Sequence, residues 1–407
     1  MLIHDTDKMS LLYSISQTLN ISNVHLKWCK IEDIVKSYCM GAFLVVKKIY
    51  ADNADPQVYS LYDIKTYQKF GLNILENASI VMHACQDANL KFLDWWLDSG
   101  LELKYDEKAI TLASANRHLG VLYWWLDSGL ELKYDSNAIN LASKNGHIQV
   151  LNWWLFSGLE LKYDKRAIIW APINNLDILN WWLNSELELK YDNEAINAAC
   201  SKGYIHVLNW WLNSGLELKY DEWAIALACE NGHLQVLDWW LDQWLDSALK
   251  IKYDETAIAL ACRNGHSNVL DWFLGSGLTL KYDCRAIIWA SEHGHLHILN
   301  WWLGSELELK YDSEAINRAS GNGHLHILNW WLDSGLELKY DSKAIYLASK
   351  KGHLHILDWW LGSGLELRYD SDAINRVSDY GHLHILDWWL GSGLGTKIRF
   401  RCNQSGL

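Results

Sequence analysis

Histidine is the residue whose spacing most strongly suggests chemistry in this sequence. Of 17 histidines, eight form His-x-His pairs near the end of the chain: His295 and His297, His324 and His326, His353 and His355, His382 and His384. Zinc needs ligands that converge on one point at about 2 Å, whereas residues i and i+2 of a helix do not face each other. We therefore expect structural histidines, with a pH-sensitive surface or a metal site as alternatives, and we predict no metal and no cofactor.

The acidic residues do not form an isolated catalytic pair. Glu102, Glu131 and Glu160 are successive copies of one repeated position. An active site would break such a pattern at one place, within a pocket. The sequence has no Ser/His/Asp or Cys/His set outside the repeated positions and no glycine-rich phosphate loop. We therefore predict no catalytic residue and no enzyme activity.

The cysteines also follow a repeated slot. Cys200, Cys229 and Cys262 occupy a position that is Ser in most other copies. Stacked repeats lie roughly 10 Å apart, whereas a disulfide needs Cα atoms within about 7 Å of each other. We expect these cysteines to be small, buried and reduced.

Charge and hydropathy limit the classes of partner. The net charge is −13, and no Lys/Arg cluster is present that could displace counterions from DNA or RNA. The first residues lack a signal-peptide pattern, and the apolar runs are far shorter than the roughly 20 residues that span a bilayer. We expect a soluble, intracellular, cytoplasmic monomer that binds neither nucleic acid nor membrane.

A doublet of bulky aromatic residues marks the elements that would position these side chains. The second member is Trp every time except at Phe273, and the spacing is 29 residues apart from one interval of 28 near Pro172 and one of 33 near Trp244. The first members are Trp95, Trp124, Trp153, Trp181, Trp210, Trp239, Trp272, Trp301, Trp330, Trp359 and Trp388. The triplet Lys-Tyr-Asp recurs with the same period. The chain is therefore predicted to be a repeat array.

Each repeat is predicted to contain two short helices. The first spans about 107–115, with Asp106 as its N-cap, and ends at an Asn-Gly-His turn such as 145–147, where Gly supplies a positive φ. The second helix contains Trp153 and Trp154 and is apolar on nearly all sides, so neighbouring repeats must cover it. An extended finger returns from its end to the next repeat. Stacking would then form one continuous core, which accounts for the tryptophans. The alternative is that the tryptophans form a platform that binds sugars or stacks on bases.

The repeat resembles the ankyrin repeat. The residues that carry the likeness are Ala-Ile-x-x-Ala, then Asn-Gly-His-Leu-x-Val-Leu and Ser-Gly, as in 224–237. The tryptophan doublet and the Leu-Glu-Leu-Lys-Tyr finger are similar to 29-residue ankyrin-like repeats of large DNA viruses that infect amoebae. The resemblance implies an all-α, curved, ankyrin-like solenoid of stacked helix-turn-helix repeats with short fingers, and a protein-binding module without enzyme activity. In a virus, the expected location is the host cytoplasm.

Two features depart from the ankyrin pattern. The usual unit has about 33 residues, so the finger is shorter here. The Thr-Pro-Leu-His start of the first helix is replaced by 108–111, which puts the family's hydrogen-bond scheme between repeats in doubt but not the stacking of helix pairs.

The pattern divides the chain into four parts. Residues 1–30 are expected to form an N-terminal cap region. Residues 31–76 would hold a degenerate repeat plus an insertion, because Gly41, Val45 and Val46 match the turn and second helix of later copies. Residues 77–394 form the ankyrin-like array of about 11 units, and 395–407 are a basic tail. The four extra residues near Trp244 are expected to lengthen a second helix by about one turn.

The positions that vary between copies are the candidate partner-binding residues. They follow the capping Asp and the Ala-Ile pair, on the side that first helices present in an ankyrin-like stack. Neutral drift on a solvated face is the equally weighted alternative. The candidates are Lys108, Thr111, Asn137, Asn140, Arg166, Ile169, Trp223, Arg285, Ile288, Glu314, Arg318, Lys343, Tyr346 and Arg376.

Trp223 is the outlier among them, because the matching positions in other copies are polar. Exposed Trp near Arg is typical of a binding hot spot, and Arg166 and Arg285 lie two repeats to either side. The alternative is that Trp223 packs against the insertion at Trp244. The sequence thus favours an interaction scaffold for a protein, which would be a host factor in a viral protein. A structural or redundant repeat protein with no dedicated partner is the second hypothesis.

Overall fold

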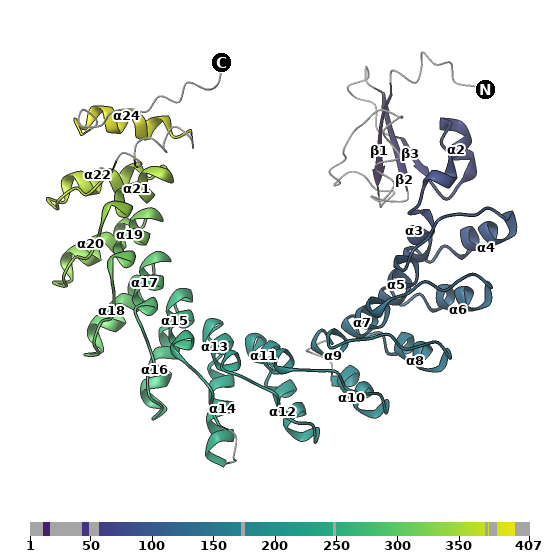
Figure 1. Cartoon of the computed structure of the whole chain (residues 1–407), viewed down its shortest axis with the longest axis horizontal. Helices are drawn as coiled ribbons and strands as arrows, with labels where there is room; N and C mark the ends of the chain where they lie inside the picture. Colours follow the sequence, from purple (N-terminus) through teal and green to yellow (C-terminus); the bar gives the residue numbers. More distant parts are fainter. Residues whose placement is uncertain are drawn as a thin grey trace. The chain divides into compact units, whose positions relative to one another are not determined.

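The computed structural model of the 407-residue chain describes residues 11–16, 43–48, 57–171, 176–246, 250–370, 373 and 381–394. They fall into two compact units, an N-terminal unit of Met1–Tyr191 and a C-terminal unit of Asp192–Leu407. Each unit is built mainly from helix pairs, one pair per repeat (Figure 1). The all-α, stacked helical solenoid expected from the repeat pattern is therefore confirmed.

The N-terminal unit begins with a small antiparallel sheet and continues into helix pairs. Its elements are β1 (Leu11–Ser16), β2 (Phe43–Lys48), β3 (Gln57–Ser60), α2 (Ile64–Phe70), η2 (Ile74–Glu76), α3 (Ile80–Gln86), α4 (Leu90–Ser99), α5 (Lys108–Ala115), α6 (Leu119–Asp127), α7 (Ser136–Lys144), α8 (Ile148–Phe156), α9 (Arg166–Ile169) and α10 (Leu176–Asn184). The strand order is β1-β2-β3.

The sheet corrects one expectation from the sequence. Val45 and Val46, matched above to a second helix in the degenerate repeat of 31–76, lie in β2, where they pair with Ser14 and Tyr13 of β1. β-Branched and aromatic residues favour the pleated, half-covered surface of a strand, and two partner strands are available to β2. Of the predicted cap at 1–30 only β1 is described, and the tail at 395–407 lies outside the described residues.

The C-terminal unit consists of helix pairs and ends, among the described residues, with α24. Its helices are α11 (Asn193–Lys202), α12 (Ile205–Asn213), α13 (Trp223–Glu230), α14 (Leu234–Asp246), α15 (Glu255–Asn264), α16 (Ser267–Gly275), α17 (Arg285–Glu292), α18 (Leu296–Gly304), α19 (Ser313–Gly321), α20 (Leu325–Asp333), α21 (Ser342–Lys350), α22 (Leu354–Gly362) and α24 (Leu383–Gly391). In both units the odd-numbered first helices stack on one another more closely than the even-numbered second helices do.

The two irregular repeats have helices of unusual length, and the longer one was predicted. α14 has 13 residues where most second helices have nine, so the four inserted residues extend the helix. α9 has only four residues and ends just before Pro172, because proline has no backbone N–H and its ring clashes with the preceding turn.

Local signals in the sequence set the helix boundaries. Asp135 has extended backbone angles and accepts a hydrogen bond from the backbone N–H of Asn137 at 2.9 Å, which caps α7. The following turn contains Gly146 with a φ of 76°, a conformation that side chains with a Cβ rarely adopt. Asp106 likewise accepts from the N–H of Lys108 at 3.0 Å.

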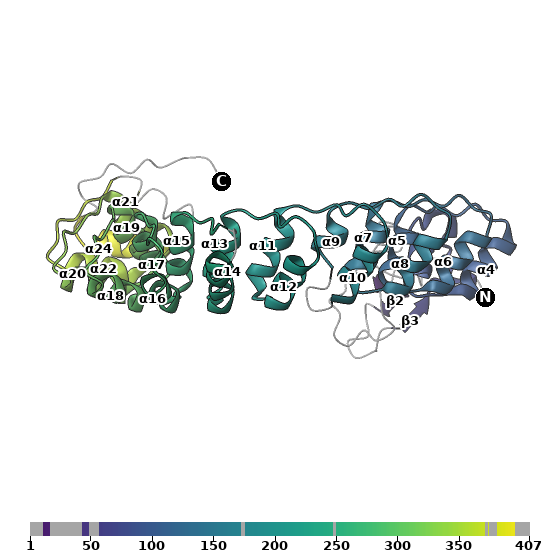
Figure 2. The same cartoon turned by 90° about the horizontal axis from the view of Figure 1, so that it is seen from below.

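The fingers are joined to one another by tyrosine and lysine. The hydroxyl of Tyr134 donates to the carbonyl oxygen of Glu160 in the next finger at 3.1 Å, and the Nζ of Lys162 lies 4.6 Å from the centre of the Tyr134 ring. The same ring packs on Trp154 with 4.9 Å between centroids. Within each unit the fingers follow one edge of the helix stack (Figure 2), so the Lys-Tyr-Asp triplet both links neighbouring fingers and caps the next helix.

Candidate protein-interaction surface

The candidate residues lie on the first helices, but four of them are buried and cannot contact a partner. Thr111, Asn140, Ile169 and Ile288 are at most 9% exposed. All four directly follow Ala-Ile in the first helix, as does Tyr346, which is partly exposed instead. These four are therefore removed from the candidate surface.

Asn140 shows what this buried position does. Its Oδ1 accepts from the backbone N–H of Asp164, the capping residue of the next repeat, at 3.3 Å. Asn317 accepts from the N–H of Asp341 at 3.2 Å, and its Nδ2 donates to the Asp341 carboxylate at 3.0 Å. An asparagine here fixes the start of the following first helix.

In the N-terminal unit, Lys108, Asn137 and Arg166 remain at the surface. Arg166 forms an ion pair with Asp164 at 2.6 Å and donates to Oδ1 of Asn137 at 3.1 Å, and its guanidinium lies 5.2 Å from the ring centre of Trp170. Hydrogen bonds from Arg166 hold the pKa of Asp164 well below its usual range. The two candidates Asn137 and Arg166 are thus brought together across neighbouring repeats.

In the C-terminal unit, four candidates line one groove of about 440 Å³. Glu314 and Arg318 lie on α19, and Lys343 and Tyr346 lie on α21. The neighbouring Gly321 has no side chain to fill the space, and Leu347 packs against it. This groove is the largest group of predicted residues that the described structure assembles.

The groove is a network of opposite charges. Glu314 pairs with Lys343 at 2.8 Å and with Arg318 at 3.0 Å, and Arg318 also pairs with Glu292 at 2.7 Å. The hydrogen bond from Lys343, with further contributions from Arg318, lowers the pKa of Glu314. All four side chains are partly exposed, and exposed ion pairs add little to stability.

Trp223 is 47% exposed at the start of α13, so its side chain is not fully buried. The side chain of Trp244 lies outside the described residues. Arg285 pairs with Asp283 at 2.8 Å and lies 5.8 Å from the ring centre of Trp289. The last candidate, Arg376, also falls outside the described residues.

The hydrogen bonds that hold the tryptophan doublets were not predicted from the sequence. The second, fully buried indole donates its N–H to the Ser/Cys slot of the preceding repeat, as from Trp154 to Ser114 at 3.2 Å and from Trp302 to the Sγ of Cys262 at 3.4 Å. The first indole donates to an Asp or Asn one repeat earlier, as from Trp181 to Asn152 at 2.7 Å. The slot residues are thus hydrogen-bond acceptors as well as small.

Burial keeps these cysteines protonated. It raises the pKa of the Cys200 and Cys262 thiols to about 12. Reactive cysteines have low pKa values and solvent access, so the slot cysteines are structural, as expected.

The histidines bind the carbonyl groups left free at the end of the preceding first helix. The Nε2 of His295 lies 2.9 Å from the carbonyl oxygen of Arg263, and the Nε2 of His297 lies 2.8 Å from that of Gly265. A Cβ on Gly265 would come within 3.0 Å of the His295 ring. The same two contacts recur at His324 with Glu292 and at His326 with Gly294, so the His-x-His pairs have the structural role predicted and connect neighbouring repeats.

The described residues contain no group of three or more His, Cys, Asp or Glu that could hold a metal ion. No helix among them is both long and apolar enough to cross a membrane.

Part of the C-terminal unit matches a known protein family. Residues 225–313, which run from α13 to α19, match the family model for ankyrin repeats in three copies. Ankyrin repeats generally mediate protein–protein interaction and are typically scaffolds without catalytic activity.

Among solved structures, the chain is similar to the human ASB11 ankyrin repeat domain, with 13% identity and a TM-score of 0.37. The match covers 47% of this chain and 96% of that domain. No curated protein matches the sequence.

Proposed function

We propose that the chain is an interaction scaffold that binds a protein partner through the exposed residues of its first helices. The observation that carries this proposal is the groove between α19 and α21, where Glu314, Arg318, Lys343 and Tyr346 line one surface. All four side chains are at least partly exposed.

The groove defines the chemistry of the partner. Arg318 and Lys343 offer donors, Glu314 offers acceptors, and Tyr346 offers a flat apolar face with a hydroxyl. Aromatic residues and arginine dominate the energetics of protein interfaces. A polar protein segment that carries both acidic and basic residues, rather than an acidic nucleic acid, would complement this set.

The likeness to repeat proteins of amoebal viruses supports a finer proposal. The tryptophan doublet and the short finger are the features in common, and a viral origin would make the partner a host factor met in the host cytoplasm. Trp223, which is exposed on α13, would be a further contact.

The experiment compares two matched double variants of the full chain. Lys343→Ala/Tyr346→Ala removes one charged and one apolar side chain from the groove. Asp333→Ala/Leu361→Ala removes the same kinds of side chain from the exposed faces of α20 and α22. Each variant, and the unaltered chain, is used as bait in an extract of the cells that make the protein. In a second experiment, a photo-cross-linking residue at position 346 of the otherwise unaltered chain marks the proteins that bind there.

We expect one protein to be captured by the unaltered chain and by the α20/α22 variant, to be lost with the groove variant, and to cross-link at position 346. Circular dichroism confirms that both variants fold. If every captured protein survives the groove variant, the groove is not the binding surface, and a repeat protein without a dedicated partner becomes the better hypothesis.

A further inference from the structure

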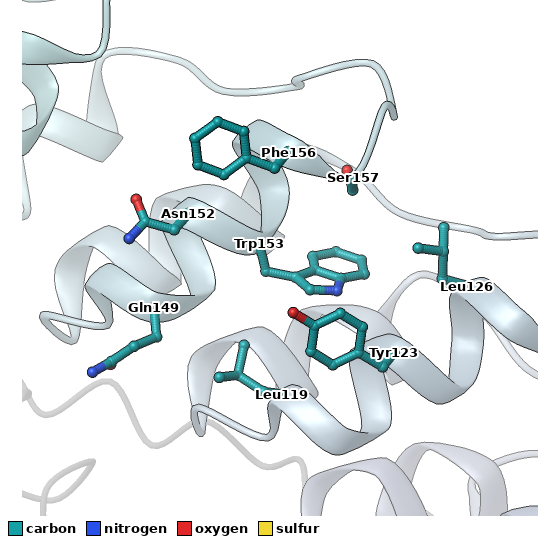
Figure 3. Close-up of a pocket in the computed structure, with 8 residues that line it drawn as sticks. All are labelled: Leu119, Tyr123, Leu126, Gln149, Asn152, Trp153, Phe156 and Ser157. Atoms are coloured by element: carbon teal, nitrogen blue, oxygen red, sulfur yellow. The ribbon is translucent and has the colours of Figure 1, made fainter.

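Exposed aromatic side chains occur at two places outside the groove between α19 and α21. In the N-terminal unit, Tyr123, Trp153 and Phe156 belong to the lining of a groove between α6 and α8, and none of the lining residues is charged (Figure 3). Such a lining fits many apolar occupants equally. In the C-terminal unit, Trp223 is exposed on α13 among residues of mainly one charge sign. The sign of that charge identifies what can bind there.

The first helices around Trp223 carry an excess of carboxylates. Segments 192–203, 221–232 and 254–265, which contain α11, α13 and α15, have seven acidic and two basic residues. In the next three repeats, at 283–294, 312–323 and 341–352, the numbers are five and five. The residues of the first set are Asp192, Glu194, Asp221, Glu222, Glu230, Asp254 and Glu255 against Lys202 and Arg263.

Two of these carboxylates are not neutralised by the chain itself. Glu222 and Glu255 are exposed, and within the described part of the chain neither forms an ion pair with a Lys or Arg. Glu230, by contrast, pairs with Arg263 at 3.9 Å. The carboxylate of Asp221 accepts from the backbone N–H of Trp223 at 3.1 Å, so its charge lies at the N-terminus of α13. This face therefore keeps negative charge that a cation of a partner can neutralise.

Trp223 also stands at a position that brings neighbouring repeats into contact. It is the second residue after the capping Asp, and at this position the Nζ of Lys343 pairs with the carboxylate of Glu314 in the preceding repeat at 2.8 Å. The counterpart of Trp223 in the preceding repeat is Glu194. α13 thus presents an indole ring where α21 presents an ammonium group to a glutamate.

The ring of Trp223 has no cation of its own. Trp170 and Trp289, which belong to the first helices of other repeats, each have an arginine four residues earlier near the ring. Arg166 lies 5.2 Å from the ring centre of Trp170, and Arg285 lies 5.8 Å from that of Trp289. No described Lys or Arg lies over the ring of Trp223. The face of an indole attracts cations more strongly than that of Tyr or Phe, so this ring can take one from a partner.

We propose that α11, α13 and α15 bind a basic segment of a protein partner, with one Arg or Lys on the ring of Trp223 and others against Glu222 and Glu255. This inference rests on the proposed function in assuming a protein partner, but it does not require the groove between α19 and α21. An extended segment rises about 3.3 Å per residue and neighbouring repeats lie roughly 10 Å apart. A basic residue at every third position therefore faces one first helix each.

The probe is a fluorescein-labelled peptide of four Arg-Gly-Ser triplets, and its binding to the full chain is measured by fluorescence anisotropy. We expect Trp223→Leu to weaken binding by ~5-fold or more, as loss of a cation–π contact does. The matched control is Trp170→Leu, the same change at a 39% exposed tryptophan that already has Arg166 near its ring, and it leaves the affinity unchanged. Circular dichroism checks that both variants fold.

Glu222→Gln/Glu255→Gln tests the charge while Trp223 is kept. Binding should weaken, and its dependence on salt should become shallower, because fewer exposed charges remain to be screened. The same peptide with citrulline in place of arginine should bind more weakly to the unaltered chain. An arginine peptide that does not bind, or one whose affinity is unchanged by Trp223→Leu or by citrulline, would overturn the proposal. The peptide reports on this surface alone, whereas cross-linking from position 346 reports on the groove, so failure of one proposal is distinguishable from failure of the other.

Discussion

At the scale of single residues, the chain is organised by indole N–H groups and their acceptors. Trp154 reaches back to Ser114 across a separation of 40 residues, and Trp302 reaches Cys262 across the same separation. Serine and cysteine are interchangeable in this slot because each offers a small side chain with an acceptor. Phe273 is the one second doublet residue without an N–H, and among the described contacts its slot residue, Cys229, receives no indole.

Ser114→Ala tests this role. The change leaves the Nε1–H of Trp154 buried without a partner, which costs about 1–3 kcal/mol in the free energy of unfolding. Ser114→Cys is the matched control and should remain within roughly 1 kcal/mol of the unaltered chain, because cysteine fills the same slot at Cys200 and Cys262. Urea unfolding followed by tryptophan fluorescence measures both. Equal losses in the two variants would mean that size, not hydrogen bonding, selects the residue.

For Trp223→Ala we expect the opposite result, a small change in stability. Trp223 is 47% exposed, so its truncation should change the free energy of unfolding by no more than about 1 kcal/mol, where a core tryptophan would cost ~3 kcal/mol or more. Truncation of the buried Trp240 provides the comparison in the same repeat. If Trp223→Ala lowered the free energy of unfolding by as much as truncation of a core tryptophan does, Trp223 would be removed from the candidate surface.

At the scale of elements, the turn between the two helices joins successive repeats. Gly265 has a φ of 79°, and a Cβ there would lie 3.0 Å from Nδ1 of His295 in the next repeat. Gly277 has a similar φ of 75° at the end of α16, and a Cβ there would meet nothing within 4 Å. Both glycines have a positive φ. They differ because a side chain of the next repeat, His295, lies against Gly265, whereas nothing lies against Gly277.

Gly265→Ala and Gly277→Ala therefore form a matched pair. Both force alanine into the left-handed region, at about 1–2 kcal/mol. Gly265→Ala also displaces the His295 ring, and we expect it to destabilise the chain by a further ~1 kcal/mol or more, as overpacking does. Chemical denaturation of the two variants gives the difference. Equal destabilisation would show that the His295 contact adds nothing to the junction between repeats.

Much of this element-level structure was predictable, because it depends on local signals. The Asp caps, the positive-φ glycines and the longer α14 follow from residues within a few positions of one another. β2 was not predictable, because a short apolar run such as 43–46 suits a strand or a buried helix equally. The burial of Thr111 and Asn140 was also missed, because variability does not reveal which side of a helix the next repeat covers. The groove between α19 and α21 was not predictable either. It depends on the missing side chain of Gly321 and on the packing of Leu347 against that glycine, which belong to different repeats.

At the scale of the whole molecule, stability is expected to be a sum of repeat and junction terms. The histidines of the turn contribute to many junctions at once. Burial lowers the pKa of His295, His324 and His353 below the ordinary value of 6.5. The same cause lowers the pKa of His147 in the N-terminal unit. The folded chain therefore holds these imidazoles neutral in a pH range where the unfolded chain binds protons.

This difference fixes the sign of the pH dependence. The unfolded state binds more protons than the folded state between the ordinary histidine pKa of about 6.5 and the lower folded values. Stability from these groups is fully present above that pH and is lost as the pH falls through the folded pKa values. Glu314 and Asp164, whose pKa values are also lowered, act in the same direction but only below their own ordinary values of 4.5 and 3.8.

Hydrogen exchange can locate the effect, which a single melting curve cannot do if the two compact units unfold separately. Between about pH 7.5 and about pH 5.5, after correction for the intrinsic exchange rate, protection should fall most at the turns of 292–296, 321–325 and 350–354. His295→Gln removes one titrating ring, so the pH dependence around 263–265 and 292–296 should become shallower while that around 350–354 is unchanged. Protection that rises as the pH falls would show that these imidazoles become charged in the folded chain, and that the turn tolerates the charge.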